Sequence, residues 1–154
     1  MRELNTFSIS RVYSRCHAKK SIYKVVKHGE MGVKKMPVVI FHLSPETKPS
    51  DELAKDVHEA VAEVLGISQE HVYVMVYNSA FSRWVHESCN ENFVFVEIFM
   101  FSGRSDEMKE RLFSRLTEII ARHTGVDGKD IILNVIESDR NNWARDGTQM
   151  SKLG

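Results

Sequence analysis

The chain has 154 residues, of which 21 are Lys or Arg and 21 are Asp or Glu, and this length is enough for one domain that buries a core without disulfides or a structural metal. No apolar run approaches the roughly 20 residues that a membrane-spanning helix needs, and the two cysteines, Cys16 and Cys89, are too few for a disulfide framework. We therefore expect a cytoplasmic protein that does not enter a membrane.

The zero net charge is the sum of two unlike segments. Residues 1–36 hold nine basic and two acidic residues, whereas residues 37–154 hold twelve basic and nineteen acidic residues. The acidic remainder argues against nucleic acid as a partner. The basic segment has three interpretations: an organelle-targeting peptide, a disordered basic arm, or residues ahead of a true start at Met36. We expect a domain at 37–154, preceded by an extension at 1–36 that is disordered or belongs to a misassigned start.

Four strands and two helices are predicted along the acidic remainder. Apolar, β-branched and aromatic runs predict strands, and apolar positions at helical spacing predict amphipathic helices. In chain order these are a strand at 37–43, a helix at 50–66, a strand at 71–77, a strand at 93–101, a helix at 105–121 and a strand at 130–136. The connection at 78–92 is predicted to be irregular.

The predicted elements form a repeat. The sequence SDELAKDVHEAVAEVLG at 50–66 aligns with SDEMKERLFSRLTEIIA at 105–121 at an offset of 55 residues. Ser50 and Ser105 are expected to be the N-cap residues of the two helices, each followed by two acidic residues at the positive end of the helix dipole. We therefore expect an α+β fold of two tandem β-α-β units, in which parallel strand pairs form a four-stranded sheet with both helices on one face.

One face of this sheet has no cover from its own chain, yet the strands are apolar on both faces. The third predicted strand, FVFVEIFMF at 93–101, alternates aliphatic with aromatic residues. In a monomer such a face would be a large exposed apolar patch. We therefore predict a homo-oligomer that packs through it.

Pro37 directly follows Met36, as in a chain whose initiator methionine is removed. With Met36 as the start, trimming leaves a proline with a free secondary amine. A terminal amine has a pKa of about 8, and burial in an apolar pocket lowers that pKa toward neutrality, where the nitrogen suits a general base and acid. Within a longer chain the same nitrogen is an amide, and Pro37 then only begins an edge strand.

Two further segments suggest a site. Arg104, in GRSDEMK at 103–109, comes just before the second helix, where backbone N–H groups favour anions and a guanidinium can hold a carboxylate through two hydrogen bonds. The alternative is a solvated surface arginine. In NNWARDG at 141–147, Asn, Asp and Gly favour a turn, and Trp143 could form an aromatic wall or an inter-subunit contact.

Together, Pro37 after an initiator-like Met, the two β-α-β units, GRSDEMK and NNWARDG resemble the tautomerase superfamily, the fold of 4-oxalocrotonate tautomerase and macrophage migration inhibitory factor. The resemblance covers about residues 36–148 and is greatest to the malonate semialdehyde decarboxylase-like branch. It implies a homotrimer with a pocket between subunits, Pro37 as the general base or acid, and Arg104 as the carboxylate-binding group. It also implies that Trp143 and Asn142 lie near the pocket rim.

The first helix departs from the pattern that the resemblance implies for hydratases and dehalogenases of the superfamily. Its late part, AVAEVL at 60–65, has no histidine, and His58 lies about a turn too early. Phe101 stands three residues before Arg104, where those enzymes would have an arginine. The expected reaction is therefore keto–enol tautomerisation of a small 2-oxo or enol carboxylate, with decarboxylation of a 3-oxo acid as the second choice.

Two other classes of function stay open at this point. A non-catalytic binding protein on the same scaffold would keep residues 1–36 as a docking arm, and a ferredoxin-like metabolite-binding module would assemble the same order of elements differently. His86 and Cys89 have no second pair to complete a zinc site, so no metal and no cofactor are expected. The roles of Glu97 and Arg83 are undecided, although a hydrogen bond within the sheet would account for Glu97.

Overall fold

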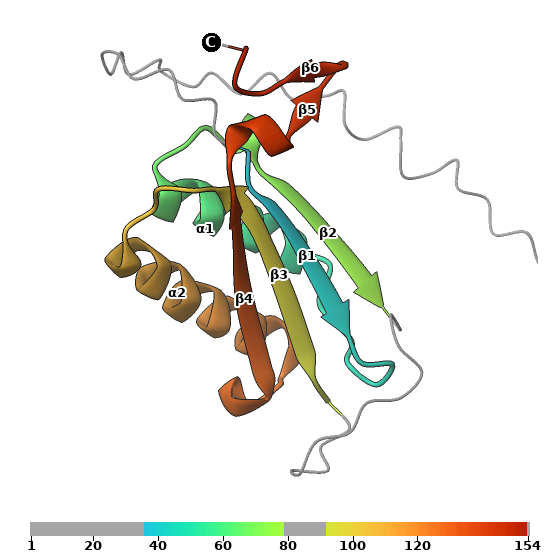
Figure 1. Ribbon diagram of the computed structural model, residues 1–154. Helices are drawn as coiled ribbons and strands as arrows, with labels where there is room; N and C mark the ends of the chain where they lie inside the picture. The colour runs from blue at the N-terminus through green and yellow to red at the C-terminus, as the bar shows by residue number, and fades with distance from the viewer. Residues whose placement is uncertain (1–35, 79–91, 154) are drawn as a thin grey trace, which may run out of the picture. The chain divides into compact units, whose positions relative to one another are not determined.

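The computed structural model describes residues 36–78 and 92–153, which lie within the compact unit Gly32–Gly154. The elements, in chain order, are β1 (Val38–Leu43), α1 (Leu53–Leu65), the 3-10 helix η3 (Gln69–His71), β2 (Tyr73–Asn78), β3 (Val94–Phe101), α2 (Asp106–Thr124), η4 (Gly128–Asp130), β4 (Ile131–Ser138), η5 (Arg140–Asn142), β5 (Ala144–Arg145) and β6 (Thr148–Gln149) (Figure 1). The basic segment up to residue 35 and the connection at 79–91, with Arg83, His86 and Cys89, lie outside the described residues. In the described ranges, none of the helices has the length and apolar character that a membrane crossing requires.

The four long strands form one mixed sheet in the order β2-β1-β3-β4. Each β-α-β unit contributes a parallel pair, β1 with β2 and β3 with β4, and the two units meet where β1 runs antiparallel to β3. This confirms the predicted fold class. The ferredoxin-like alternative is wrong, because that fold is a split β-α-β, with another strand between the two strands of a unit, whereas β1 and β2 are direct neighbours.

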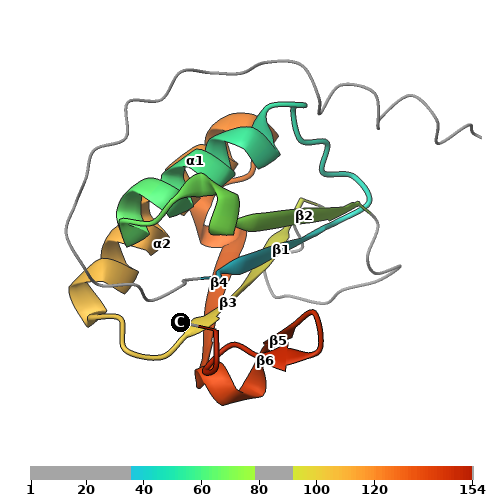
Figure 2. The same cartoon turned by 90° about the horizontal axis from the view of Figure 1, so that it is seen from above.

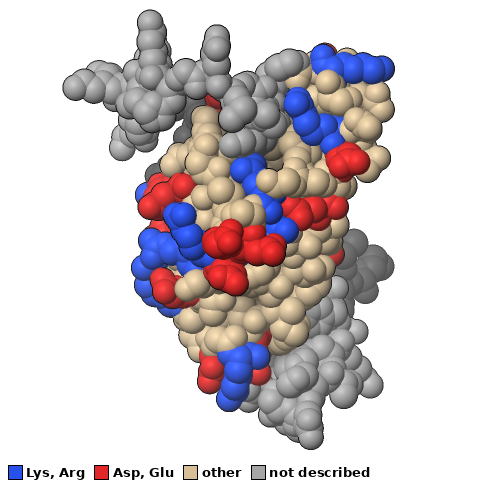
Figure 3. Space-filling view, turned by 60° about the vertical axis from the view of Figure 1, so that its left-hand side comes forward, with Lys and Arg blue, Asp and Glu red and all other residues tan. Residues whose placement is uncertain are grey.

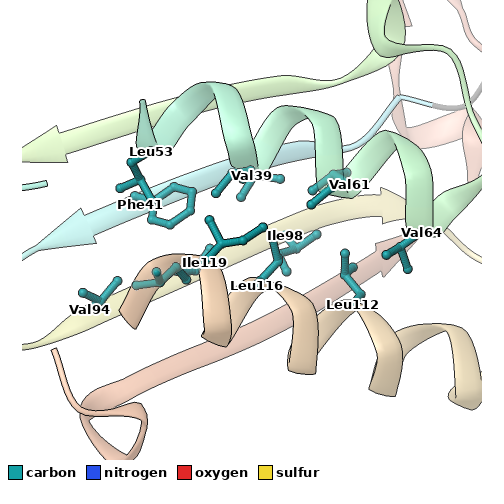
Figure 4. Packing of buried hydrophobic residues seen from close by; sticks show 14 of the residues in the cluster. Val39, Phe41, Leu53, Val61, Val64, Val94, Ile98, Leu112, Leu116 and Ile119 are labelled. Carbon is teal, nitrogen blue, oxygen red and sulfur yellow. The ribbon is translucent and has the colours of Figure 1, made fainter. Parts of the chain in front are cut away.

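Both helices cover the same face of the sheet (Figure 2), and the hydrophobic core lies between them and that face (Figure 4). The side chains that meet here are at most 2 % exposed: Val39, Phe41 and Leu43 of β1, Val94, Val96 and Ile98 of β3, Leu53, Val57 and Val61 of α1, and Leu112, Leu116 and Ile119 of α2. Full burial of one such side chain is worth about 1.5–3 kcal/mol. The alternating strand residues and the helical stripes therefore fix both helices on this face.

The outward surface of the helical layer is charged. On the side brought forward in Figure 3, acidic and basic side chains lie among one another. Arg115 lies 3.5 Å from Glu118 within α2, and Arg122 of α2 lies 2.9 Å from Asp56 of α1. Exposed pairs of this kind contribute about 0–1 kcal/mol each, so the core rather than these pairs holds the layer together.

The two helices begin differently, although the sequence predicts a serine cap for both. α2 begins after Ser105, whose Oγ accepts the N–H of Met108 at 3.2 Å, so this prediction is confirmed. The prediction for Ser50 is wrong, because α1 begins at Leu53 and its N-cap residue, Glu52, makes no side-chain cap bond. The Ser50 backbone N–H is tied to the carbonyl of His123 at 3.1 Å, and its hydroxyl lies 2.5 Å from Nδ1 of the same residue.

The face of the sheet opposite the helices, here called the open face, exposes large apolar side chains. Tyr73, Met75 and Tyr77 of β2 are 40, 39 and 49 % exposed, and Ile132 of β4 is 46 % exposed. In the register of the strands these residues lie on the same side as His42 of β1. Among the described residues, no helix covers this face of the sheet, as the alternation of the strands predicts.

Beyond β4 the chain forms a small hairpin that the sequence reading did not predict as such. β5 and β6 pair antiparallel, and the two residues between them, Asp146 and Gly147, have φ angles of 50° and 71°. Positive φ at both positions of a two-residue loop is typical of a type I′ turn, for which Asp-Gly is a favoured sequence. The hairpin lies on the side of the sheet away from the helices (Figure 2), so it covers one end of the open face.

Candidate active site

The predicted site residues gather at one end of the sheet, here called the Pro37 end, where β1 begins and β3 and β4 finish (Figure 1). Pro37 immediately precedes β1 and is buried. Its carbonyl accepts the N–H of Tyr73 at 3.0 Å, which fixes it to the start of β2. Because β1 and β3 are antiparallel, the start of β1 meets the end of β3, and Arg104 follows that end by three residues. The topology thus brings Pro37 and Arg104 to the same end.

Arg104 is partly buried, and its guanidinium is turned toward the end of α1. Nη1 donates to the carbonyl of Leu65 at 3.4 Å and lies 3.9 Å from Sδ of Met108. Desolvation lowers the pKa of Arg104, and the charge of Glu137 opposes that shift. Within residues 36–78 and 92–153, hydrogen bonds are recorded for Nη1 but not for Nε or Nη2. The Nε and Nη2 edge can hold a carboxylate through two parallel hydrogen bonds.

A carboxylate that the sequence reading missed lies beside Arg104. Glu137, in β4, accepts the backbone N–H of Arg104 at 3.4 Å and binds Nζ of Lys109 at 2.7 Å. The hydrogen bond from Lys109 is the main cause that lowers the pKa of Glu137, and the same bond raises the pKa of Lys109. The only sequence signal was an acidic residue at the end of an apolar strand, with no hint of its partners.

Trp143 lies on the other side of the Pro37 end. Its Nε1 donates to Oγ of Ser138 at 2.7 Å, and its ring meets Phe101 edge to face at 5.7 Å between centroids. Arg140 lies over the same Phe101 ring at 5.8 Å. Trp143 is thus fixed by its own subunit, on the open-face side of the sheet. Asn142 is exposed, and its backbone N–H donates to the carbonyl of Asp139 at 2.9 Å.

Tyr73 and Arg145 were also missed. The guanidinium of Arg145, in β5, donates to the phenol oxygen of Tyr73. Tyr73 in turn is the residue whose N–H binds the Pro37 carbonyl. The hairpin is therefore connected through one side-chain pair to β2, the strand whose Tyr73 N–H binds the Pro37 carbonyl. The sequence reading treated Arg145 as part of a turn, because nothing local linked it to β2.

No group of three or more His, Cys, Asp or Glu side chains able to hold a metal ion occurs among the residues that the structure describes. The arrangement at the Pro37 end offers other chemistry: a buried proline, a partly desolvated guanidinium with an open edge, and a carboxylate already neutralised by a lysine. Such a set can bind a small carboxylate. With a free amine at Pro37 it can also move a proton.

Two family models, both described as "Tautomerase enzyme", match residues 37–87 and 81–145. A search of curated proteins returned no match. Solved structures with the same fold include a fused 4-OT described as a symmetric trimer, at 19 % identity and a TM-score of 0.68, covering 76 % of this chain and 98 % of that one.

Two further structures share the fold. Pt0534, inactivated by 2-oxo-3-pentynoate, is 17 % identical with a TM-score of 0.67 and covers 76 % of this chain and 98 % of that one. FG41 malonate semialdehyde decarboxylase, inhibited by 3-bromopropiolate, is 22 % identical with a TM-score of 0.58 and covers 77 % of this chain and 94 % of that one. The two family matches follow one another along the four-stranded fold described above, and the chain belongs to the tautomerase superfamily.

Proposed function

We propose that this protein is a tautomerase that uses the amino-terminal nitrogen of Pro37 as its general acid and base, on a small 2-oxo or enol carboxylate. The observation that carries the proposal is the position of Pro37 and Arg104 at the same end of the sheet, with one edge of the guanidinium unbonded among the described residues. Arg104 binds the carboxylate, and Pro37 moves the proton.

The proposed reaction is the conversion of an enol to its keto form. The neutral Pro37 nitrogen takes the proton of the 2-hydroxyl while the C2–O bond becomes a carbonyl and the electrons of the C2–C3 double bond move to C3. The protonated Pro37 nitrogen then gives that proton to C3, which regenerates the neutral amine. A general acid or base in position contributes about 10²–10⁴-fold to the rate. The burial of Pro37 supports this role, because desolvation lowers the pKa of an amine toward neutrality.

The mechanism requires that the mature chain begins at Pro37, since an amide nitrogen has no basic lone pair. We propose that residues 1–36 are absent from the active protein. The proposal is supported by the family match that begins at residue 37. If the extension stays attached, the same fold acts instead as a non-catalytic binding protein.

The proposed assembly is a homotrimer that packs through the open face. The exposed Tyr73, Met75, Tyr77 and Ile132 support an interface of this kind, as does the fused 4-OT structure, which is described as a trimer.

A second candidate reaction is the decarboxylation of a 3-oxo acid. The similarity to FG41 malonate semialdehyde decarboxylase favours it, and the proposed closest branch is that of this enzyme. Here a protonated Pro37 would polarise the 3-carbonyl while the bond between C2 and the leaving carboxyl group breaks. CO2 departs, the bonding electrons form an enol between C2 and C3, and C2 then takes a proton from the Pro37 nitrogen as the carbonyl is restored.

The test is a kinetic comparison on phenylenolpyruvate, a generic enol carboxylate, with protein that begins at Pro37. Pro37→Ala is expected to lower kcat/KM by at least about 100-fold if the cyclic amine is the acid and base. Arg111→Ala, at an exposed position on α2, is the matched surface control. Full activity of Pro37→Ala, which still begins with an amine, would show that the proline ring is not required, and full activity after acetylation of the Pro37 amine would remove this nitrogen from the mechanism.

A further inference from the structure

The turn that carries Arg104 is bonded to the last residues of β4. Glu137 pairs with Met100 in the sheet, and its carboxylate accepts the backbone N–H of Arg104 at 3.4 Å. The backbone N–H of Gly103 also stabilises this carboxylate. The N–H of Ser102 donates to the carbonyl of Ser138 at 3.2 Å. Two N–H groups of this turn, those of Ser102 and Arg104, therefore donate to β4, one to its backbone and one to a side chain.

This turn needs such support because of its glycine. Gly103 has a φ of 104°, in a region that side-chain-bearing residues rarely adopt, and glycine loses more backbone freedom on folding than other residues. The direction in which the Arg104 side chain leaves the backbone is thus weakly fixed by local preference. The Glu137 carboxylate, which accepts the Arg104 N–H, restricts it.

The ion pair with Lys109 completes the arrangement. Here Oε2 of Glu137 is occupied by Nζ of Lys109 at 2.7 Å, and Oε1 by the Arg104 N–H. Glu137 therefore holds the backbone of Arg104 and forms no hydrogen bond with its guanidinium.

We propose that Glu137 is a positioning residue for carboxylate binding: it fixes the Gly103–Arg104 backbone so that the Nε and Nη2 edge of Arg104 faces the substrate. This rests on the proposed function, because it takes Arg104 as the carboxylate-binding group. Lys109 balances the charge of Glu137, and among the described residues its side chain forms no hydrogen bond or ion pair with the turn at 102–104.

The experiment compares Glu137→Ala with Lys109→Ala in protein that begins at Pro37. Both changes break the same 2.7 Å ion pair between β4 and α2, but only the first removes the acceptor of the Arg104 N–H. We expect Glu137→Ala to raise KM for phenylenolpyruvate about tenfold, equivalent to roughly 1.4 kcal/mol, with kcat little changed. Lys109→Ala should change KM for phenylenolpyruvate by less than about threefold.

Glu137→Gln supplies an intermediate that keeps a neutral acceptor and serves if the alanine variant does not fold. Because a neutral acceptor is weaker than a carboxylate, its KM should lie between those of the wild type and Glu137→Ala. Amide hydrogen exchange at Gly103 and Arg104 should quicken in both Glu137 variants and not in Lys109→Ala. The proposal would be overturned if Glu137→Ala and Lys109→Ala had equal effects on KM. It would also be overturned if the KM of Glu137→Gln did not lie between those of the wild type and Glu137→Ala.

A binding measurement separates this proposal from the proposed catalysis. Cinnamate has the carbon skeleton and carboxylate of the substrate but no enol, so its dissociation constant, measured by calorimetry, does not depend on proton transfer. The protein could bind cinnamate with dissociation constants that rise from the wild type through Glu137→Gln to Glu137→Ala and yet have no tautomerase activity. That result would support the positioning role of Glu137 and contradict the catalytic role of Pro37. If wild-type protein does not bind cinnamate, both fail.

Discussion

His42 and Glu97 form a pair in the middle of the otherwise apolar open face, with His42 Nε2 lying 2.9 Å from Glu97 Oε2. The two residues occupy equivalent positions of the two repeats, 55 residues apart. Tyr77 and Phe95 stack on the His42 ring at 6.0 and 5.8 Å between centroids. An assembly through this face would bury the pair between subunits, which makes its two members depend on each other.

The first prediction concerns this pair. His42→Leu should weaken the assembly, because it leaves the Glu97 carboxylate buried without its partner, whereas the double change His42→Leu/Glu97→Leu should restore or exceed the wild-type stability of the oligomer. Breaking one side of a buried pair costs about 3–5 kcal/mol, while replacing both sides with apolar residues is often neutral or stabilising. Sedimentation equilibrium measures the dissociation constants. Equal assembly of the single and double variants would show that the open face is not the interface.

The second prediction concerns the chemistry of Arg104. Arg104→Lys keeps the positive charge but loses the planar edge that binds a carboxylate through two hydrogen bonds. We expect KM for phenylenolpyruvate to rise about tenfold, since one charge-assisted bond of roughly 1.5–3 kcal/mol is lost or weakened. Arg111→Lys on the outer surface of α2 is the matched control. An unchanged KM in Arg104→Lys would argue for a solvated surface arginine.

The third prediction is a pH dependence of stability that originates where the two helices meet. Asp56 of α1 lies 2.8 Å from Nε2 of His123 and 2.9 Å from Nη2 of Arg122. The hydrogen bond with His123 is the main cause that lowers the pKa of Asp56. A lowered folded pKa stabilises the fold at pH values above the unfolded pKa of about 3.9, and this contribution is lost as the pH falls through the folded pKa.

Urea unfolding between pH 2 and pH 7 tests this dependence. Asp56→Asn should be less stable than the wild type at pH 7, and the difference should shrink at the acidic end of the range. Asp51→Asn, at an exposed position that forms no ion pair with any residue the structure describes, is the control. A stability difference that stays constant down to pH 2 would contradict the assignment to the Asp56 charge.

The fourth prediction follows from the unequal beginnings of the helices. Ser105→Ala removes the cap that accepts the Met108 N–H and should lower the free energy of unfolding by about 1 kcal/mol. Ser114→Ala, in the middle of the same helix and exposed, should be neutral or slightly stabilising because alanine favours helix. If both substitutions had the same effect in denaturant titrations, the cap would contribute nothing.

The sequence predicted those features that depend on local periodicity. The strands, the helices and the parallel pairs follow from alternation, helical spacing and the length of the crossovers. The N-cap at Ser105 was recognised for the same reason. Ser50 has the same local pattern, but the chain there is tied to His123, 73 residues away, and this contact replaced the cap. A local sequence pattern cannot indicate that a residue of a distant helix will form a hydrogen bond with the expected cap residue.

The candidate site, too, could be predicted from the sequence only in part. Pro37 and Arg104 could be named from the sequence, because each belongs to a motif. That they lie at one end of the sheet depends on the antiparallel register of β1 with β3, which no short pattern specifies. Glu137 and Tyr73 were missed because their partners are distant in the sequence and come close only in the folded chain. These partners are Lys109 and the Arg104 backbone for Glu137, and Pro37 and Arg145 for Tyr73.

The most direct test of the central claim compares the turnover of phenylenolpyruvate by two forms of the same chain. One form begins at Pro37, with its mass confirmed, and the other retains residues 1–36. The account predicts activity in the first form and a loss of at least about 100-fold in the second, because the nitrogen of Pro37 is then an amide and cannot act as a general base. Equal turnover by a form whose intact mass still includes residues 1–36 would contradict it.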